Sequence, residues 1–194
     1  MAKINPQDEK YDGNQKTPQC QTGRKLLAAV GFERFKSSTN KPMLGIRFVC
    51  LLDRSDKGDE GNITFDNFTL TDAAMWRIVM LARGLNYNEP FDPELDEDIG
   101  QLLMSGYVDA ELVSETFKGN TTVRPKEYML AAEFDESPEW PAMIGEAEEQ
   151  FKEYLTWRAA NPRGDKGSGG SGGSSRGGKS GGNGGSGRRG NVPF

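Results

Sequence analysis

The sequence predicts a mainly β fold, a small barrel of five strands with helices, followed by a C-terminal helix and a disordered tail. Short segments in which apolar and polar residues alternate, separated by turn signals, indicate the strands. Two longer segments have apolar residues at helical spacing. From residue 163 onward the chain holds 14 of its 25 glycines, and this composition cannot form a core.

Three strands are expected in the first half of the chain. The first covers 24–35 (RKLLAAVGFERF), and Gly31 inside it predicts a bulge. The second covers 43–53 (MLGIRFVCLLD), whose alternate residues form one apolar face. The third covers 63–70 and follows a loop that contains two glycines.

Helices are expected in three places. Thr71 suits an N-cap, and the helix that it begins should run to about Arg83. An acidic segment, 86–98, follows, with a short helix expected after Pro93. The second amphipathic helix covers 140–158 and has glutamates on the side opposite its apolar stripe.

The last two strands are expected at 107–117 and 121–134, joined by the turn dipeptide Gly119-Asn120. Pro125 predicts an edge strand or a bulge. Three strands, a helix and two further strands follow one another in the oligonucleotide-binding (OB) barrel. We therefore expect a five-stranded OB-fold.

Four regions are expected along the chain. They are a flexible N-terminal arm at 1–20, an OB-fold nucleic-acid-binding domain at 21–136, a C-terminal amphipathic helix at 137–162, and a disordered Gly/Ser/Arg-rich tail at 163–194. The first residues lack an apolar h-region, and no stretch approaches 18 apolar residues. We therefore expect a cytoplasmic protein, in the host cytoplasm if it is viral, with no membrane contact.

Charge is divided unevenly between the body and the tail. The tail has six basic residues and one acidic residue, a net +5, which leaves −10 for residues 1–162 of the chain's total of −5. Within the acidic body, the segment 24–57 has eight basic residues against three acidic ones. An asymmetry of this kind indicates charged partners.

Basic and aromatic side chains occur together in the first two strands and around the turn between the last two. Cations follow phosphates and aromatic faces stack on bases, the two contacts that single-stranded nucleic acid needs. The candidate phosphate contacts are Lys25, Arg34, Lys36, Lys41, Arg47, Arg54, Lys118, Arg124 and Lys126. The candidate stacking residues are Phe32, Phe35, Phe117 and Tyr128. The alternative interpretation is solvated strand edges, where lysines oppose aggregation.

The residues favour no enzymatic activity. The chain has no histidine, which excludes a Ser-His-Asp or Cys-His site and a histidine metal site. The segment 173–180 satisfies the P-loop pattern but lies in Gly/Ser sequence, without the strand and helix that such a loop needs. The acidic run 89–98 lacks the spacing of a calcium loop. We expect no cofactor and no metal, and a metal-dependent nuclease is the least favoured alternative.

The chain ends in Pro193-Phe194, an apolar tip with a carboxylate that suits capture in a partner's pocket. Together with the OB pattern and the glycine-rich tail, this end resembles the single-stranded DNA-binding proteins of bacteria and phages. The resemblance implies single-stranded DNA as the ligand, and replication or recombination proteins as partners of Pro193 and Phe194. The acidic residues that this family has before the tip are replaced by Arg188, Arg189 and Asn191. This difference favours contact between the tail and DNA.

Residues 36–43, 65–76 and 112–122 also resemble a family of small phage and prophage proteins that accompany replication and recombination. We therefore expect a single-stranded DNA-binding protein of phage DNA replication or recombination, with little sequence preference. The alternative is an acidic protein-interaction or inhibitory module that does not bind DNA. The sequence leaves both a monomer and a homo-oligomer open.

Overall fold

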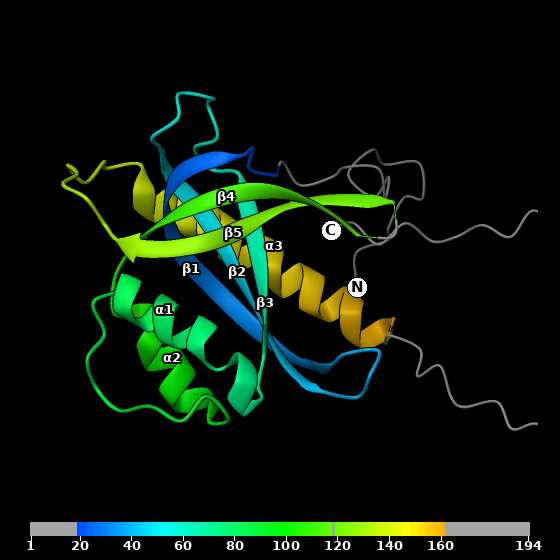
Figure 1. Ribbon diagram of the computed structural model, residues 1–194. Helices are drawn as coiled ribbons and strands as arrows, with labels where there is room; N and C mark the ends of the chain where they lie inside the picture. Colours follow the sequence, from blue (N-terminus) through cyan, green and yellow to red (C-terminus); the bar gives the residue numbers. More distant parts are fainter. Residues whose placement is uncertain (1–18, 118, 162–194) are drawn as a thin grey trace, which may run out of the picture. The chain divides into compact units, whose positions relative to one another are not determined.

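Five antiparallel strands form one sheet in the order β3-β2-β1-β4-β5 (Figure 1). The strands are β1 (Gly23–Lys36), β2 (Pro42–Asp53), β3 (Ile63–Thr69), β4 (Val108–Phe117) and β5 (Asn120–Leu130). The prediction of a mainly β fold with five strands is confirmed. β1 pairs with β2 from Lys25 to Lys36 and with β4 at its beginning, so it is the central strand.

This computed structural model describes residues 19–117 and 119–161, without the side chains at 117 and 120. The described residues all belong to one unit, Thr17–Pro162. The N-terminal arm up to residue 18, Lys118, and the tail with Pro193 and Phe194 lie outside them.

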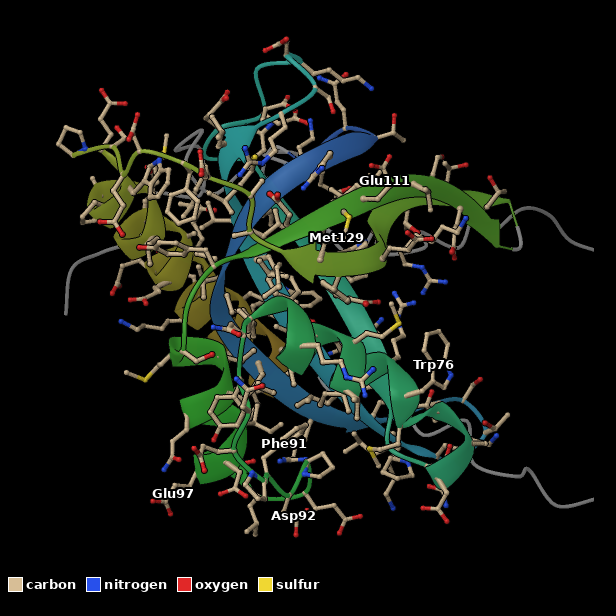
Figure 2. The ribbon with its side chains drawn as sticks, turned by 60° about the vertical axis from the view of Figure 1, so that its left-hand side comes forward. Trp76, Phe91, Asp92, Glu97, Glu111 and Met129 are labelled. Carbon is tan, nitrogen blue, oxygen red and sulfur yellow. The ribbon has the colours of Figure 1, made fainter. Side chains whose placement is uncertain are left out.

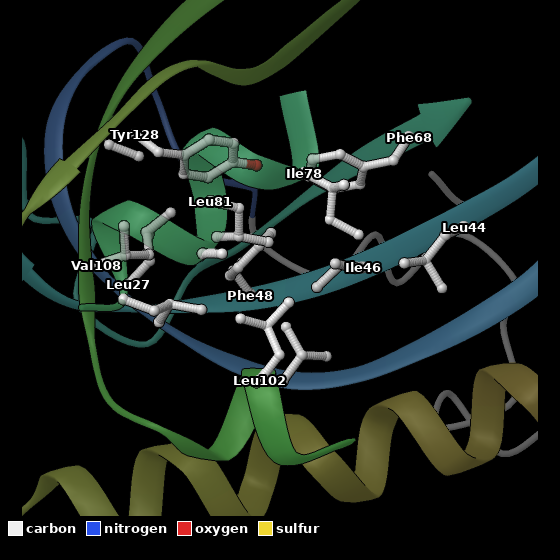
Figure 3. Close-up of a cluster of buried hydrophobic side chains, with 14 of the residues drawn as sticks. Leu27, Leu44, Ile46, Phe48, Phe68, Ile78, Leu81, Leu102, Val108 and Tyr128 are labelled. Carbon is white, nitrogen blue, oxygen red and sulfur yellow. The ribbon is translucent and has the colours of Figure 1, made fainter. Parts of the chain in front are cut away.

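The main core lies on the inner face of the sheet, under two short helices. Leu44, Ile46 and Phe48 of β2 point into it, as the alternation in the sequence predicts (Figure 3). The helices α1 (Trp76–Gly84) and α2 (Asp96–Met104) contribute Leu81 and Leu102 to the same cluster. The helices between β3 and β4 thus cover one end of this face (Figure 1).

The first helical segment begins differently from the prediction. A 3₁₀ turn, η2 (Asp72–Ala74), precedes α1, and the side chain of Thr71 makes no capping hydrogen bond. Thr71 thus occupies the predicted N-cap position with an extended backbone, but it caps a 3₁₀ turn and does so without the expected side-chain hydrogen bond. Gly84 is the last residue of α1, and a Cβ there would lie 2.6 Å from Cγ2 of Val108, so glycine allows the helix to lie this close to β4.

The helix α3 (Trp140–Ala160) packs against β1 and β2 on the side of the sheet opposite the main core (Figure 1). Along β1 and β2, the residues between those that point into the main core are also apolar, and α3 buries them. This second layer consists of Leu26, Ala28, Val49, Leu51, Trp140, Ala147 and Phe151. The C-terminal helix is therefore packed on the sheet.

Both predicted irregularities of the strands are confirmed. The β1–β2 register shifts between Ala29 and Gly31, and the β4–β5 register shifts opposite Pro125. β5 ends at Leu130, earlier than predicted, because the chain leaves the sheet there and the Ala132 N–H donates to the Asp109 carboxylate at 3.0 Å.

The edge strands β3 and β5 approach each other without a backbone ladder among the described residues. Thr64 Oγ1 donates to the Val123 carbonyl at 3.2 Å, and the Tyr128 hydroxyl donates to Asp66 at 2.8 Å. The sheet is open along this seam, whereas the sequence predicts a barrel.

Candidate nucleic-acid interface

The side chains of β2 and β3 that point away from the main core form a continuous surface with the end of β1. The strand register places Met43, Gly45 and Arg47 opposite Thr69, Asn67 and Phe65. A Cβ on Gly45 would lie 3.1 Å from both Phe35 and Asn67, so these groups share one side of the sheet. We call this surface the outer face, and it comprises Glu33, Phe35, Met43, Gly45, Arg47, Phe65, Asn67 and Thr69.

Two phenylalanines lie half-buried on the outer face. Phe35 opposes Met43 at the end of β1, and Phe65 opposes Arg47 on β3. Phe65 lies there because Phe68, an odd number of positions away, points into the core. Aromatic rings on a strand surface can stack on nucleobases of any sequence.

The helix α3 adds a row of aromatic side chains beside the outer face. Phe151, Tyr154 and Trp157 are spaced by three residues, which places them on one side of the helix. The ring centroids are 6.0 Å apart for Phe151 and Tyr154, and 6.4 Å apart for Tyr154 and Trp157. We call these three residues the aromatic row. Phe151 is buried, and Trp157 is 38% exposed.

Arg47 connects the outer face to the aromatic row. Its guanidinium lies 5.1 Å from the ring centroid of Phe151 and 4.8 Å from that of Tyr154. Burial lowers the pKa of Arg47 to about 10, against the opposing influence of Tyr154 and Glu33. The buried guanidinium is therefore a cation–π link between the sheet and α3, and this position argues against a phosphate contact.

Three of the predicted cations are both exposed and outside the ion pairs that the structure describes. Lys36 and Lys41 flank the β1–β2 turn, at the border of the outer face, and Lys126 lies on β5. None of the three has an ion pair among the residues that the structure describes. They are therefore available for phosphate contacts.

Lys25 has a different environment from the one that a phosphate contact requires. Its side chain is fully buried, and Nζ lies 2.5 Å from Oδ1 of Asp53 and 2.8 Å from Oδ2 of Asp59. Burial opposes the charged amine, but the two carboxylates outweigh it and raise the pKa of Lys25. Lys25 is therefore a core ion-pair residue, and we do not include it in the interface.

Three of the four predicted arginines are held in ion pairs. Arg34 pairs with Asp96, Arg54 with Asp109, and Arg124 with Glu115. Arg54 also donates to the carbonyl of Ala132, so it joins the end of β2 to the segment after β5. Part of the positive charge that the sequence places in 24–57 is thus paired with carboxylates of the body.

Two predicted stacking residues pack into the main core. Phe32 is partly buried against it, and Tyr128 is buried, with its hydroxyl on Asp66. Burial, followed by the Asp66 carboxylate, raises the pKa of Tyr128 well above its usual value. Of the predicted stacking residues, Phe35 alone has a described side chain on the outer face, because those of Phe117 and Lys118 are outside the described part.

The sequence prediction missed Phe65, Tyr154 and Trp157. Strand alternation around Phe68 would have placed Phe65 on the outside. The spacing of Tyr154 and Trp157 from Phe151 would have revealed one aromatic side of the helix. The packing of α3 on β1 and β2, which brings that side to the sheet, has no local signal in the sequence.

Other kinds of site have little support in the described part of the chain. No group of three or more His, Cys, Asp or Glu residues there is placed to hold a metal ion. No helix there has the length and apolar character needed to cross a membrane. A scan against protein-family models and a search of curated proteins gave no match to this chain.

Proposed function

We propose that this protein binds single-stranded DNA through the outer face, with little sequence preference, and acts without catalysis in phage DNA replication or recombination. The observation that carries the proposal is one surface with half-buried aromatic rings, Phe35 and Phe65, bordered by exposed Lys36 and Lys41. Rings that stack and cations that meet phosphates are the two parts of a single-strand site. The tip, Pro193 and Phe194, would recruit replication or recombination proteins in the cytoplasm.

We also propose that the sheet is a partly open OB barrel. Joining the edges of the observed strand order would place β3 beside β5, which is the OB arrangement. Three groups already span this seam: Thr64 with Val123, Asp66 with Tyr128, and Arg77, which donates to both Asp66 and the Pro125 carbonyl. OB barrels bind oligonucleotides on the face of their second and third strands and with the loop between the first two. The outer face and the Lys36–Lys41 turn occupy these positions.

One group of the body's acidic residues lies away from the outer face, whereas Glu146, Glu148, Glu149 and Glu153 lie on α3. Asp92 and Glu97, with the other carboxylates of 89–98, lie around the start of α2 (Figure 2). That helix covers the inner face, on the opposite side of the sheet from α3 and the aromatic row. Nucleic acid on the outer face would therefore avoid this group of negative charges.

The test is fluorescence anisotropy with labelled oligo-dT and a matched duplex over a range of salt concentrations. We expect salt-dependent binding that favours the single strand. Replacing Lys36 and Lys41 with glutamine should reduce the salt slope by about 1.4, at about 0.7 for each lost phosphate contact on a single strand. Arg83→Gln, an exposed site on α1, is the control and should leave the slope unchanged. Absence of binding by the full chain would refute the proposal.

The second candidate function is an acidic protein-interaction module. It is favoured by the internal ion pairs of Arg34, Arg54 and Lys25, which leave few exposed cations on a body of charge −10. Such a protein would not be retained on single-stranded DNA cellulose at low salt. It would instead be retained on an anion-exchange column, and added salt would weaken this retention.

A further inference from the structure

The exposed end of the aromatic row lies beside a proposed DNA-binding surface, yet it belongs to the C-terminal helix. Phe151 is buried against the sheet, and the row continues through Tyr154 to Trp157, whose ring is 38% exposed. Successive rings are inclined to each other by only 20° and 27°. The row therefore presents its last ring to solvent in an ordered stack.

We propose that Trp157 is a base-stacking residue and that α3 forms one wall of the single-strand site. This inference rests on the proposed function and deepens it, because it adds a helix to an interface otherwise built from strands and loops. An indole offers a large flat surface on which a base of any kind stacks. The ligand is a nucleobase of a single strand laid along the outer face.

The row is fixed to the sheet by contacts from three strand residues. A Cβ on Gly31 would lie 2.4 Å from the Phe151 ring, so this ring can pack against β1 because Gly31 has no side chain. Arg47 lies over both Phe151 and Tyr154, and the Tyr154 hydroxyl donates to Glu33 at 2.9 Å. A ring held in place before binding loses little conformational freedom when a base stacks on it. Arg47 is thus a positioning residue for the row.

The other two tryptophans supply the internal controls. Trp140 is 4% exposed and lies with Tyr107 and Phe134 at the start of α3. Trp76 is 57% exposed and points outward from the beginning of α1 (Figure 2). Exposure alone would select Trp76, whereas proximity to the outer face selects Trp157. The two exposed tryptophans therefore distinguish a specific stacking site from general contact with exposed rings.

The experiment measures oligo-dT binding by the full chain through anisotropy and through quenching of tryptophan fluorescence. Trp157→Ala should weaken binding about 5- to 100-fold, as expected for the loss of one stacked base, and Trp157→Phe should retain most of the affinity. Trp157→Phe should also lose most of the quenching, while Trp76→Phe should keep both quenching and affinity. Circular dichroism confirms that each variant is folded.

Wild-type affinity in Trp157→Ala, with the wild type binding normally, would overturn this inference and leave the proposed function intact. Failure of the wild type to bind would overturn the proposed function and this inference with it. If the aromatic row instead joined two copies of the chain, Trp157→Ala would lower the mass in sedimentation without changing affinity per protomer, and this result would also overturn the inference.

Discussion

The buried ion-pair group of Lys25, Asp53 and Asp59 gives a sharp prediction about stability. All three side chains are fully buried, and the amine holds two carboxylates at 2.5 and 2.8 Å. Lys25→Met keeps much of the volume but leaves both carboxylates without their counterion. Breaking a buried pair by removing one partner costs about 3–5 kcal/mol. We expect a loss of this size in the free energy of unfolding at pH 7, measured by urea denaturation.

The pH dependence of the loss tests the electrostatic cause. Burial opposes ionisation of Asp53 and Asp59, but Lys25 and backbone N–H groups outweigh it and lower both pKa values. In the wild type, these carboxylates therefore stabilise the fold above about pH 4, and the stabilisation is lost as pH falls through their folded pKa values. Without Lys25, burial dominates, so the folded pKa values rise and the variant loses stability as pH increases.

The difference between wild type and Lys25→Met should thus grow from pH 3 to pH 7. An equal difference at both pH values would refute the reasoning and would point to a packing defect. Lys152→Met is the control, because Lys152 forms an exposed ion pair with Glu149 and its loss should not move the urea midpoint measurably. Under conditions in which Lys25→Met is folded, the salt slope of its oligo-dT binding should equal that of the wild type, because a buried amine does not contact phosphate.

Two further predictions concern the seam between β3 and β5 and the tail. Burial raises the pKa of Asp66 against the influence of Arg77 and Tyr128. The contribution of this carboxyl group to the free energy of unfolding therefore decreases as pH rises and the group ionises. Arg77→Met should therefore lower the free energy of unfolding by about 3 kcal/mol, and by more at pH 7 than at pH 4. Urea denaturation at the two pH values measures this loss, and an equal loss at both would contradict the prediction. Removal of 163–194 should lower the salt slope for oligo-dT by up to about 4, given six basic residues at about 0.7 each. An unchanged slope in the anisotropy assay would exclude contact between the tail and DNA.

Much of the fold could be predicted from local sequence patterns. Alternation identified the five strands, Gly31 and Pro125 identified the bulges, and the helical spacing in 140–158 identified α3. These features depend on neighbours in the chain, which a single sequence displays. Thr71 is an N-cap as predicted, but of a 3₁₀ turn that precedes α1, because propensity at one residue does not determine which kind of turn forms.

The candidate site was harder to predict because charge and exposure are properties of the folded chain. In the sequence, nothing distinguishes the surroundings of Lys25 and Arg47 from those of Lys36 and Lys41. In the fold, Lys25 is buried in an ion pair with Asp59, and Arg47 is buried under α3. Arg54 is neutralised by Asp109, 55 positions away. Such long-range partners cannot be recognised from composition. Counting the basic residues of 24–57 therefore overestimated the positive charge at the surface.

The two contributions that single-strand binding needs therefore come from different parts of this chain. The outer face offers aromatic rings but few available cations, since its arginine, Arg47, is held in a cation–π contact and the exposed Lys36 and Lys41 lie only at its border. The tail has six basic residues and no aromatic residue other than Phe194. Stacking is insensitive to salt, whereas phosphate contacts weaken steeply with it. Body and tail should thus be separable by salt: at high salt, the remaining affinity should depend on Phe65 and Trp157, and at low salt it should depend mainly on the tail.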